Sequence, residues 1–132
     1  MRRMMISRSP VRQYGQAPAV EFNGGRRLAL DVMSDETGYT VLADVPGLGA
    51  EEIEIELEQD VLTLKAEHAQ VEEDERESVW QERRKGTSVR KLRLPEPVDR
   101  EGIEAWVENG VLTVRLPKVE EARPKKIEVA VR

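Results

Sequence analysis

The chain has 132 residues, a length that suits one domain with flanking segments. Its residues are 39% hydrophobic and 36% charged with a net charge of −5, so a core is possible but much of the chain must face water. Cysteine is absent, which excludes a disulfide framework and thiol chemistry, and no run approaches the roughly 20 apolar residues of a membrane helix. The N-terminus is positively charged without a signal-peptide core. We therefore expect a soluble cytoplasmic protein that does not bind membranes.

The N-terminal segment differs in charge from the rest of the chain. Residues 1–27, which we call the arm, carry six arginines and one acid, a net +5, so the other residues carry −10. An acidic body argues against nucleic acid as a partner. Pro10, Gly15, Pro18 and the Asn23–Gly25 run interrupt any period in the arm. It is either a flexible, solvated segment or one that docks on an acidic surface, its own chain's or a neighbour's.

From residue 28 onward, apolar residues recur with a period of two, which is typical of strands with one buried face. The pattern predicts strands at 28–32, 39–45, 53–57, 61–66, 88–94, 103–107 and 111–116, with a last short alternation at 127–131. Turn signals separate them at intervals of about 8 to 12 residues, which favours an all-β, immunoglobulin-like sandwich. Residues 67–86 are a charged stretch interrupted by Val79 and Trp80. A loop is favoured there over a helical turn, because the stretch has no apolar face.

Two of the predicted hairpins have similar sequences. Residues 53–63 align with 103–113 at an offset of 50, with matching isoleucine, glutamate and Val-Leu-Thr positions. In the second hairpin, Asn109–Gly110 fits a type I′ turn, in which both central residues need positive φ. We expect one hairpin in each sheet, although chance convergence of two amphipathic hairpins explains the similarity equally well.

The motifs of enzymes are missing. The one histidine, His68, lies in a glutamate-rich stretch and is expected to be an ordinary surface residue. The Asn23–Arg26 run lacks the lysine and spacing of a phosphate-binding loop, and no serine lies in a Gly-x-Ser-x-Gly elbow. We predict no catalytic residue, no metal site and no cofactor, and hence no enzyme.

The C-terminal alternation of Ile127, Val129 and Val131 follows a basic, proline-containing spacer at residues 123–126. Such a segment can add an edge strand to its own sheet. It can equally dock on another chain by β-augmentation, in which main-chain hydrogen bonds and side-chain pockets act together. The residues alone leave both readings open.

Four stretches in order along residues 28–131 resemble one known family. They are Ala43–Gly47 with Glu52 and Ile53, then Arg90–Glu96, Ala105–Lys118, and Ile127–Val129. The chain resembles the small heat-shock proteins that carry an alpha-crystallin domain, of the bacterial and archaeal type. The resemblance implies three parts: the flexible arm at 1–27, a domain of seven or eight strands at 28–118 with a dimerisation loop at 67–86, and a C-terminal extension at 119–132, which we call the tail.

The resemblance also implies an activity and partners. Members of this family are ATP-independent holdases that bind partly unfolded client proteins and suppress their aggregation. They assemble from homodimers, and their tails can join dimers into higher oligomers. The arm here has few aromatic residues, and Ser88 stands where an aromatic is common, so a dimer or small assembly is expected. The alternative is a sandwich-type interaction module or co-chaperone for folded partners, against which the tail motif and the loop argue.

The resemblance assigns residues to these contacts. A strand in the loop inserts into the partner's sheet, so the expected dimer interface is Val79, Trp80, Glu82, Arg83 and Arg90. We hypothesise that Arg90 pairs with Glu82 across the dimer. The tail motif, Ile127 and Val129, would occupy a groove between the edge strands of the two sheets, lined by Ile53, Ile55, Ile103 and Ala105. Clients would bind that groove or the apolar residues of the arm, which are Met4, Met5, Ile6, Tyr14 and Phe22.

Overall fold

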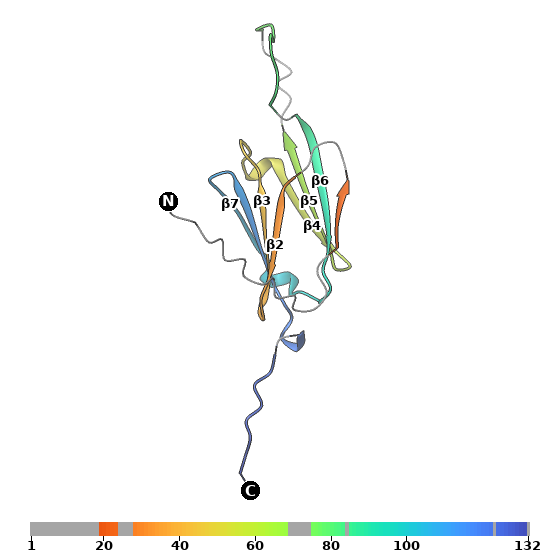
Figure 1. Cartoon of the computed structure of the whole chain (residues 1–132), viewed down its shortest axis with the longest axis vertical. Helices are drawn as coiled ribbons and strands as arrows, with labels where there is room; N and C mark the ends of the chain where they lie inside the picture. Colours follow the sequence, from red (N-terminus) through yellow and green to blue (C-terminus); the bar gives the residue numbers. More distant parts are fainter. Residues whose placement is uncertain (1–18, 24–27, 69–74, 84, 123, 132) are drawn as a thin grey trace, which may run out of the picture.

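The computed structural model describes residues 19–23 by backbone, and residues 28–68, 75–83, 85–122 and 124–131. These form two four-stranded antiparallel sheets packed face to face, which confirms the predicted all-β sandwich (Figure 1). We call the sheet with strand order β1-β6-β5-β4 sheet A, and the sheet with order β2-β3-β8-β7 sheet B. The strands are β1 (Ala19–Asn23), β2 (Leu30–Ser34), β3 (Gly38–Asp44), β4 (Ile53–Glu58), β5 (Val61–His68), β6 (Gly86–Arg93), β7 (Glu104–Glu108) and β8 (Val111–Pro117).

The core lies between the sheets and follows the period of two. In β3, Tyr39, Val41 and Ala43 are buried, and in β8 the buried residues are Leu112, Val114 and Leu116. Sheet A contributes residues of the same kind, Leu62, Leu64, Ala66 and Leu92. Burying each large aliphatic side chain contributes about 1.5 to 3 kcal/mol relative to exposure. One apolar face per strand is therefore enough to hold the two sheets together.

The two similar hairpins occupy equivalent positions, one in each sheet, as expected. The β4–β5 hairpin pairs Glu58 with Val61, and the β7–β8 hairpin pairs Glu108 with Val111. Both two-residue turns have positive φ throughout: 47° and 62° at Gln59 and Asp60, 51° and 76° at Asn109 and Gly110. This is the type I′ geometry predicted for the second hairpin, and the first adopts it without glycine.

The strand prediction was wrong at the N-terminal side of the sandwich. Residues 19–23, expected to be irregular, form β1, which pairs with β6 from Ala19 opposite Arg93 to Asn23 opposite Val89. Because β6 already pairs with β5 on one side, β1 provides hydrogen-bonding partners for the main-chain groups on the other side of β6. The sequence pattern within residues 19–23 does not reveal this pairing. Residues 127–131, whose alternation left open either an edge strand of their own sheet or docking on another chain, form no strand and are exposed. A strand needs a neighbouring ladder, which the tail does not find in the described part of its own chain.

A polar network fixes the turn between β2 and β3. The carboxylate of Asp35 accepts hydrogen bonds from the backbone N–H groups of Thr37 and Gly38, at 2.7 and 2.9 Å, and from the Thr37 hydroxyl. Arg115 on β8 donates to Thr37 Oγ1 and Thr40 Oγ1, at 2.5 and 3.0 Å. The buried Lys118 donates to the Asp35 carbonyl at 3.0 Å. The network thus joins β8 to the β2–β3 turn and to β3, its neighbour in the sheet, at one end of sheet B.

Candidate functional site

The packing of the two sheets brings β4 and β7 to the same flank of the sandwich. Arg90 on β6 donates a 2.6 Å hydrogen bond to the carbonyl of Leu28, just before β2. The β6 side of sheet A therefore lies over the β2 edge of sheet B. In an aligned sandwich the opposite edges, β4 and β7, then lie on the other flank. A 2.7 Å bond from Val45 N to Gly110 O joins the β7–β8 turn to the segment that leads from β3 to β4.

Along this flank, apolar side chains face the core but are only partly covered. Ile53, Ile55 and Ile103 are half-buried and pack against the core, as the expected groove requires. Ala105 faces inward on β7 but is exposed. The flank includes two residues that the sequence analysis missed, Leu57 and Val107, which are half-buried at the next inward positions. The same alternation that singled out their neighbours could have found them. We call Ile53, Ile55, Leu57, Ile103 and Val107 the edge row.

The tail extends away from the sandwich and leaves its motif uncovered (Figure 1). Ile127 is 85% exposed and Val129 is 86% exposed. Within the described part of one chain, the tail motif and the edge row are therefore not in contact. Both present aliphatic side chains to water.

The described part of the loop, residues 75–83 and 85, projects beyond the ends of β5 and β6, and the tail leaves the opposite end of the sandwich (Figure 1). No strand forms in this part, including residues 79–83, for which the family resemblance implies a strand in the dimer. Val79 and Trp80 are 91% and 81% exposed. The indole Nε1 of Trp80 donates to Glu82 Oε1 at 2.8 Å, and Lys85 donates to Gln81. Hydrogen bonds within the loop thus hold the conformation of residues 80–83 and 85, while the apolar side chains of Val79 and Trp80 remain exposed.

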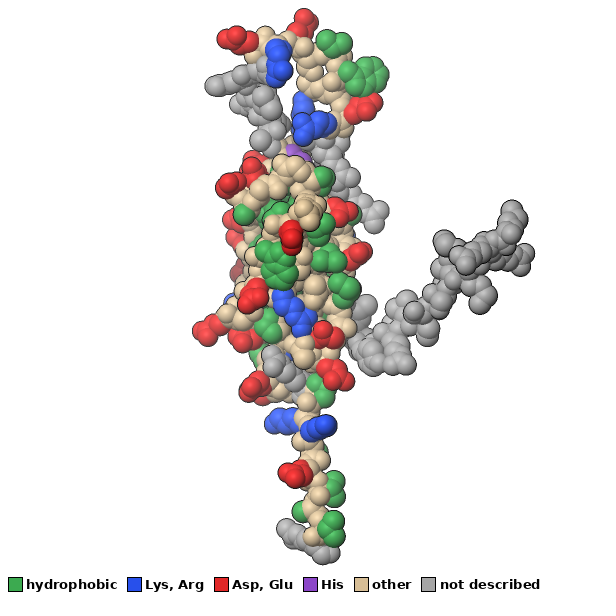
Figure 2. Space-filling model, turned by 90° about the vertical axis from the view of Figure 1, so that its left-hand side faces the viewer, with side chains coloured by type: hydrophobic (Ala, Val, Ile, Leu, Met, Phe, Trp, Pro, Cys, Tyr) green, Lys and Arg blue, Asp and Glu red, His purple; other side chains and the backbone are tan. Residues whose placement is uncertain are grey.

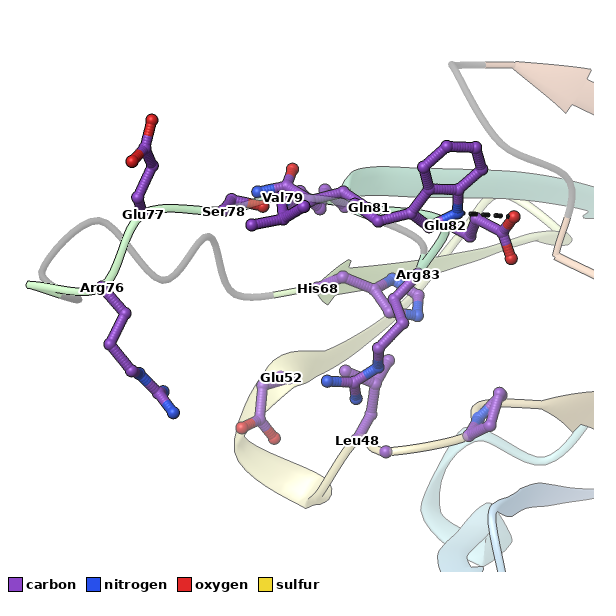
Figure 3. Close-up of a pocket in the computed structure, with 14 residues that line it drawn as sticks. Leu48, Glu52, His68, Arg76, Glu77, Ser78, Val79, Gln81, Glu82 and Arg83 are labelled. Atoms are coloured by element: carbon purple, nitrogen blue, oxygen red, sulfur yellow. Dashed lines mark hydrogen bonds between the residues drawn. The ribbon is translucent and has the colours of Figure 1, made fainter.

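Beneath the loop lies a hollow of about 860 Å³ that the strand ends help to line (Figure 3). Figure 3 shows Arg83 directed toward Leu48 and Glu52, with the ring of His68 beside it. His68, expected at the surface, is half-buried at the end of β5. Among the described residues, no group of three or more His, Cys, Asp or Glu side chains is placed to hold a metal ion.

Arg90 and Glu82, which we expected to pair across a dimer, have other contacts within one chain. Arg90 is half-buried in β6 and bonds to the Leu28 carbonyl, whereas Glu82 bonds to Trp80. Arg83, the other basic residue of the expected interface, lies against the Pro46–Leu48 turn. The structure of one chain therefore leaves the Arg90–Glu82 pairing as a prediction.

The apolar residues of the arm are the remaining expected site. Met4, Met5, Ile6 and Tyr14 lie outside the described residues, and Phe22 is described only by the backbone of β1, opposite Arg90.

Within the described ranges, no helix has the length and hydrophobicity to span a bilayer.

Comparison with known proteins places most of the chain in one group. Residues 31–132 match the family model described as the Hsp20/alpha crystallin family. A 17.6 kDa class I heat shock protein from Arabidopsis thaliana is 40% identical over 112 residues, which cover 83% of this chain and 72% of that protein. A 17.8 kDa class I heat shock protein of the same plant is 44% identical over 85 residues; the match spans 63% of this chain and 54% of that protein's length.

Solved structures show the same fold. Heat shock protein 16.0 from Schizosaccharomyces pombe superposes with a TM-score of 0.67 at 31% identity, covering 82% of this chain and all of that one. A small heat-shock protein from Xylella fastidiosa, described as having a distinct high order structure, gives 0.64 at 28% identity and covers 80% of this chain and 98% of that one. The sequence relatives are mainly plant class I heat shock proteins, with bacterial proteins from Mycobacterium avium and Rickettsia felis among them, so the bacterial and archaeal type stays a prediction.

Proposed function

Since this chain belongs to the Hsp20/alpha crystallin family of small heat shock chaperones, we propose that it is an ATP-independent holdase that binds partly unfolded proteins and suppresses their aggregation. The observation that carries the proposal is apolar surface left uncovered on a well-packed sandwich. The edge row is half-buried, and Val79, Trp80, Ile127 and Val129 are more than four-fifths exposed. This apolar surface would bind a client more tightly when the client is unfolded than when it is native. The bound client would then stay in a soluble complex.

The proposed assembly unit is a homodimer formed by strand exchange through the loop. The loop projects past the sandwich, and β2 is an edge strand of sheet B with one described strand neighbour, β3. Residues 79–83 of one chain would add a strand to the β2 edge of the other, with main-chain hydrogen bonds supplying affinity. Arg90, anchored beside β2 by its bond to Leu28, would then lie within reach of the incoming Glu82.

The proposed second contact joins the tail of one chain to the edge row of another. Burying two aliphatic side chains contributes roughly 3 to 6 kcal/mol before the cost of ordering the tail. After that cost the contact is weak and exchangeable. A tail that leaves its site would uncover the edge row for a client, so assembly and client binding would compete for one surface.

The test is light scattering from a heat-labile enzyme, warmed with increasing amounts of the protein and without nucleotide. We expect suppression near stoichiometric ratios. Ile55→Ser removes an edge-row side chain from β4 and should weaken suppression, whereas Glu56→Ser changes the exposed, outward neighbour on the same strand and should not. Absence of suppression by a folded wild-type protein would reject the holdase and favour an interaction module for folded partners.

A further inference from the structure

The outer face of sheet B carries an apolar patch that the proposed function does not use. Side chains that alternate with the buried ones in β2, β3, β8 and β7 point outward, among them Met33, Leu42, Val111 and Trp106. Met33 is 49% exposed and Trp106 is 45% exposed. The strand register places Thr113 between Trp106 and Leu42, and Met33 diagonally beside Leu42. We call these four apolar residues the outer patch.

Acidic residues surround the outer patch. Asp31, Asp44, Glu104 and Glu108 are the outward-facing acids of the four strands, and all are exposed. Arg115 is the one outward-facing base, and it is engaged with Thr40, Thr37 and Asp35. Figure 2 shows hydrophobic side chains gathered in the middle of the side on which sheet B lies, with acidic side chains toward both margins. This face is therefore both apolar and strongly negative.

The other outer face is different in charge. On β4, β5 and β6 of sheet A, Glu54, Glu56, Glu58 and Glu67 face Lys65, Lys91 and Arg93. Four acids against three bases leave a net −1 on these three strands, and Glu21 of β1, opposite Lys91 in the register, brings the face to −2, compared with −3 for four acids and one base on sheet B. A cationic, apolar segment would thus be attracted more strongly to sheet B.

The N-terminal part of the arm has the matching composition. Residues 1–18 contain Arg2, Arg3, Arg8 and Arg12, no acid, and the consecutive hydrophobes Met4, Met5 and Ile6. The tail is a poorer match, because residues 119–132 carry four bases and three acids. A second copy of this face is poorer still, since two surfaces of net −3 repel each other. Charge therefore selects the arm as the occupant.

The arm can reach the patch of its own chain. It begins its described path at Ala19 in β1, on the flank where sheet A lies over β2. With the partner's strand added to the β2 edge as proposed above, the route around that edge to Trp106 on β7 is roughly 35 Å, about 10 Å between the sheets plus five strand spacings. The 13 residue steps from Ile6 to Ala19 span up to about 45 Å when extended. We propose that residues 1–18 dock on the outer patch of the same chain, with Met4, Met5 and Ile6 covering Trp106 and Met33 and with the arginines facing the surrounding acids.

The test uses the absence of cysteine and the presence of two tryptophans, Trp80 and Trp106. In full-length Trp80→Phe protein, Ser7→Cys is labelled with a bimane dye, which tryptophan quenches at contact range. We expect quenched emission that is restored when Trp106→Phe is added, and restored near 1 M salt, where the Debye length is about 3 Å. The matched control carries the dye at Lys65→Cys, on the outer face of sheet A. Its emission should be the same with and without Trp106. Far-ultraviolet circular dichroism verifies that each variant is folded.

Equal emission with and without Trp106 in folded protein would overturn the proposal. Replacing Arg2, Arg3, Arg8 and Arg12 by glutamine gives a second measurement and should restore emission while Trp106 remains. Diluting labelled protein into an excess of unlabelled Trp80→Phe, Trp106→Phe protein should leave the quenching unchanged. Loss of quenching on dilution would place a neighbour's arm on the patch and overturn the same-chain assignment.

Discussion

Arg115 on β8 and Asp35 in the β2–β3 turn form an ion pair 80 positions apart in the sequence, with Arg115 Nη2 3.4 Å from Asp35 Oδ1. The pair is one part of a carboxylate site made by the turn itself. The Thr37 hydroxyl is the largest cause that lowers the pKa of Asp35 from 3.8 to about 2, with the Thr37 and Gly38 N–H groups and Arg115 adding to it and burial opposing it. The turn is therefore stabilised by a charge that acid removes.

The first prediction concerns acid stability. A pKa lower in the folded than in the unfolded chain stabilises the fold above the unfolded value, near 4, and this stabilisation is lost as the pH falls toward 2. Asp35→Asn should lower the free energy of unfolding at neutral pH by about 1 kcal/mol, a value reduced because the carboxylate is largely exposed. Urea unfolding at several pH values measures it, with Glu36→Gln in the same turn as the control. A difference between wild type and Asp35→Asn that persists at pH 2 would contradict the assignment.

The second prediction concerns the two type I′ turns. Asp60 adopts a φ of 62°, a conformation that costs a side chain about 1 kcal/mol and glycine almost nothing. Asp60→Gly should therefore raise the free energy of unfolding by up to about 1 kcal/mol. Gly110→Ala, at a φ of 76° in the matching turn, should lower it. Thermal unfolding of both variants measures the effects, and destabilisation by Asp60→Gly would show that its side chain contributes more than its backbone strain costs.

The third prediction concerns the tail. Ile127→Ser with Val129→Ser should leave the melting temperature of the sandwich unchanged, because both side chains are exposed in the isolated chain. The same change should reduce the mass of any assembly larger than a dimer, measured by light scattering coupled to gel filtration. Val131→Ser, at a position 99% exposed and outside the motif, is the matched control. An assembly larger than a dimer that keeps its mass in the double variant would remove the tail from the contact.

The fourth prediction concerns the expected dimer pair. Glu82→Arg should weaken the dimer by placing like charges together, and adding Arg90→Glu should restore part of the affinity. Arg90→Glu alone should also lower the melting temperature, because it removes the bond to the Leu28 carbonyl. Sedimentation equilibrium measures the dimer, and the double variant separates charge pairing from loss of that bond. A Glu82→Arg protein that dimerises normally would remove Glu82 from the interface.

The sequence predicted those parts of the fold that depend on alternation and turn chemistry. Residues 39–45 and 111–116 alternate, and the turn at Asn109–Gly110 has the residues that its geometry favours. β1 was missed because it depends on the main-chain edge of β6, which no pattern within residues 19–23 reveals. In the tail, residues 127–131 alternate as a strand would, but no described strand lies beside them and they form none.

The candidate site depends on the family resemblance, and the groove stays a prediction. Ile53, Ile55 and Ile103 were named because the resemblance implies a groove at the two edge strands; all three are half-buried against the core, and Ile103 lies just before β7. Leu57 and Val107 share this inward alternation on β4 and β7 and are half-buried in the same way. The outer patch was not foreseen, because an exposed Trp106 or Met33 gains meaning only when the register places it beside Leu42.

The glutamates of β4 have a consequence for the protein's own solubility when it is concentrated and heated. β4 ends sheet A, so its outer main-chain groups could template fibre growth with another copy. Glu54, Glu56 and Glu58 occupy every outward position of that strand. Two such strands joined edge to edge would set three carboxylates against three, without cations between them. The inward face of β4 can thus carry the apolar side chains of the edge row, because repulsion between the glutamates on its outward face opposes fibril formation.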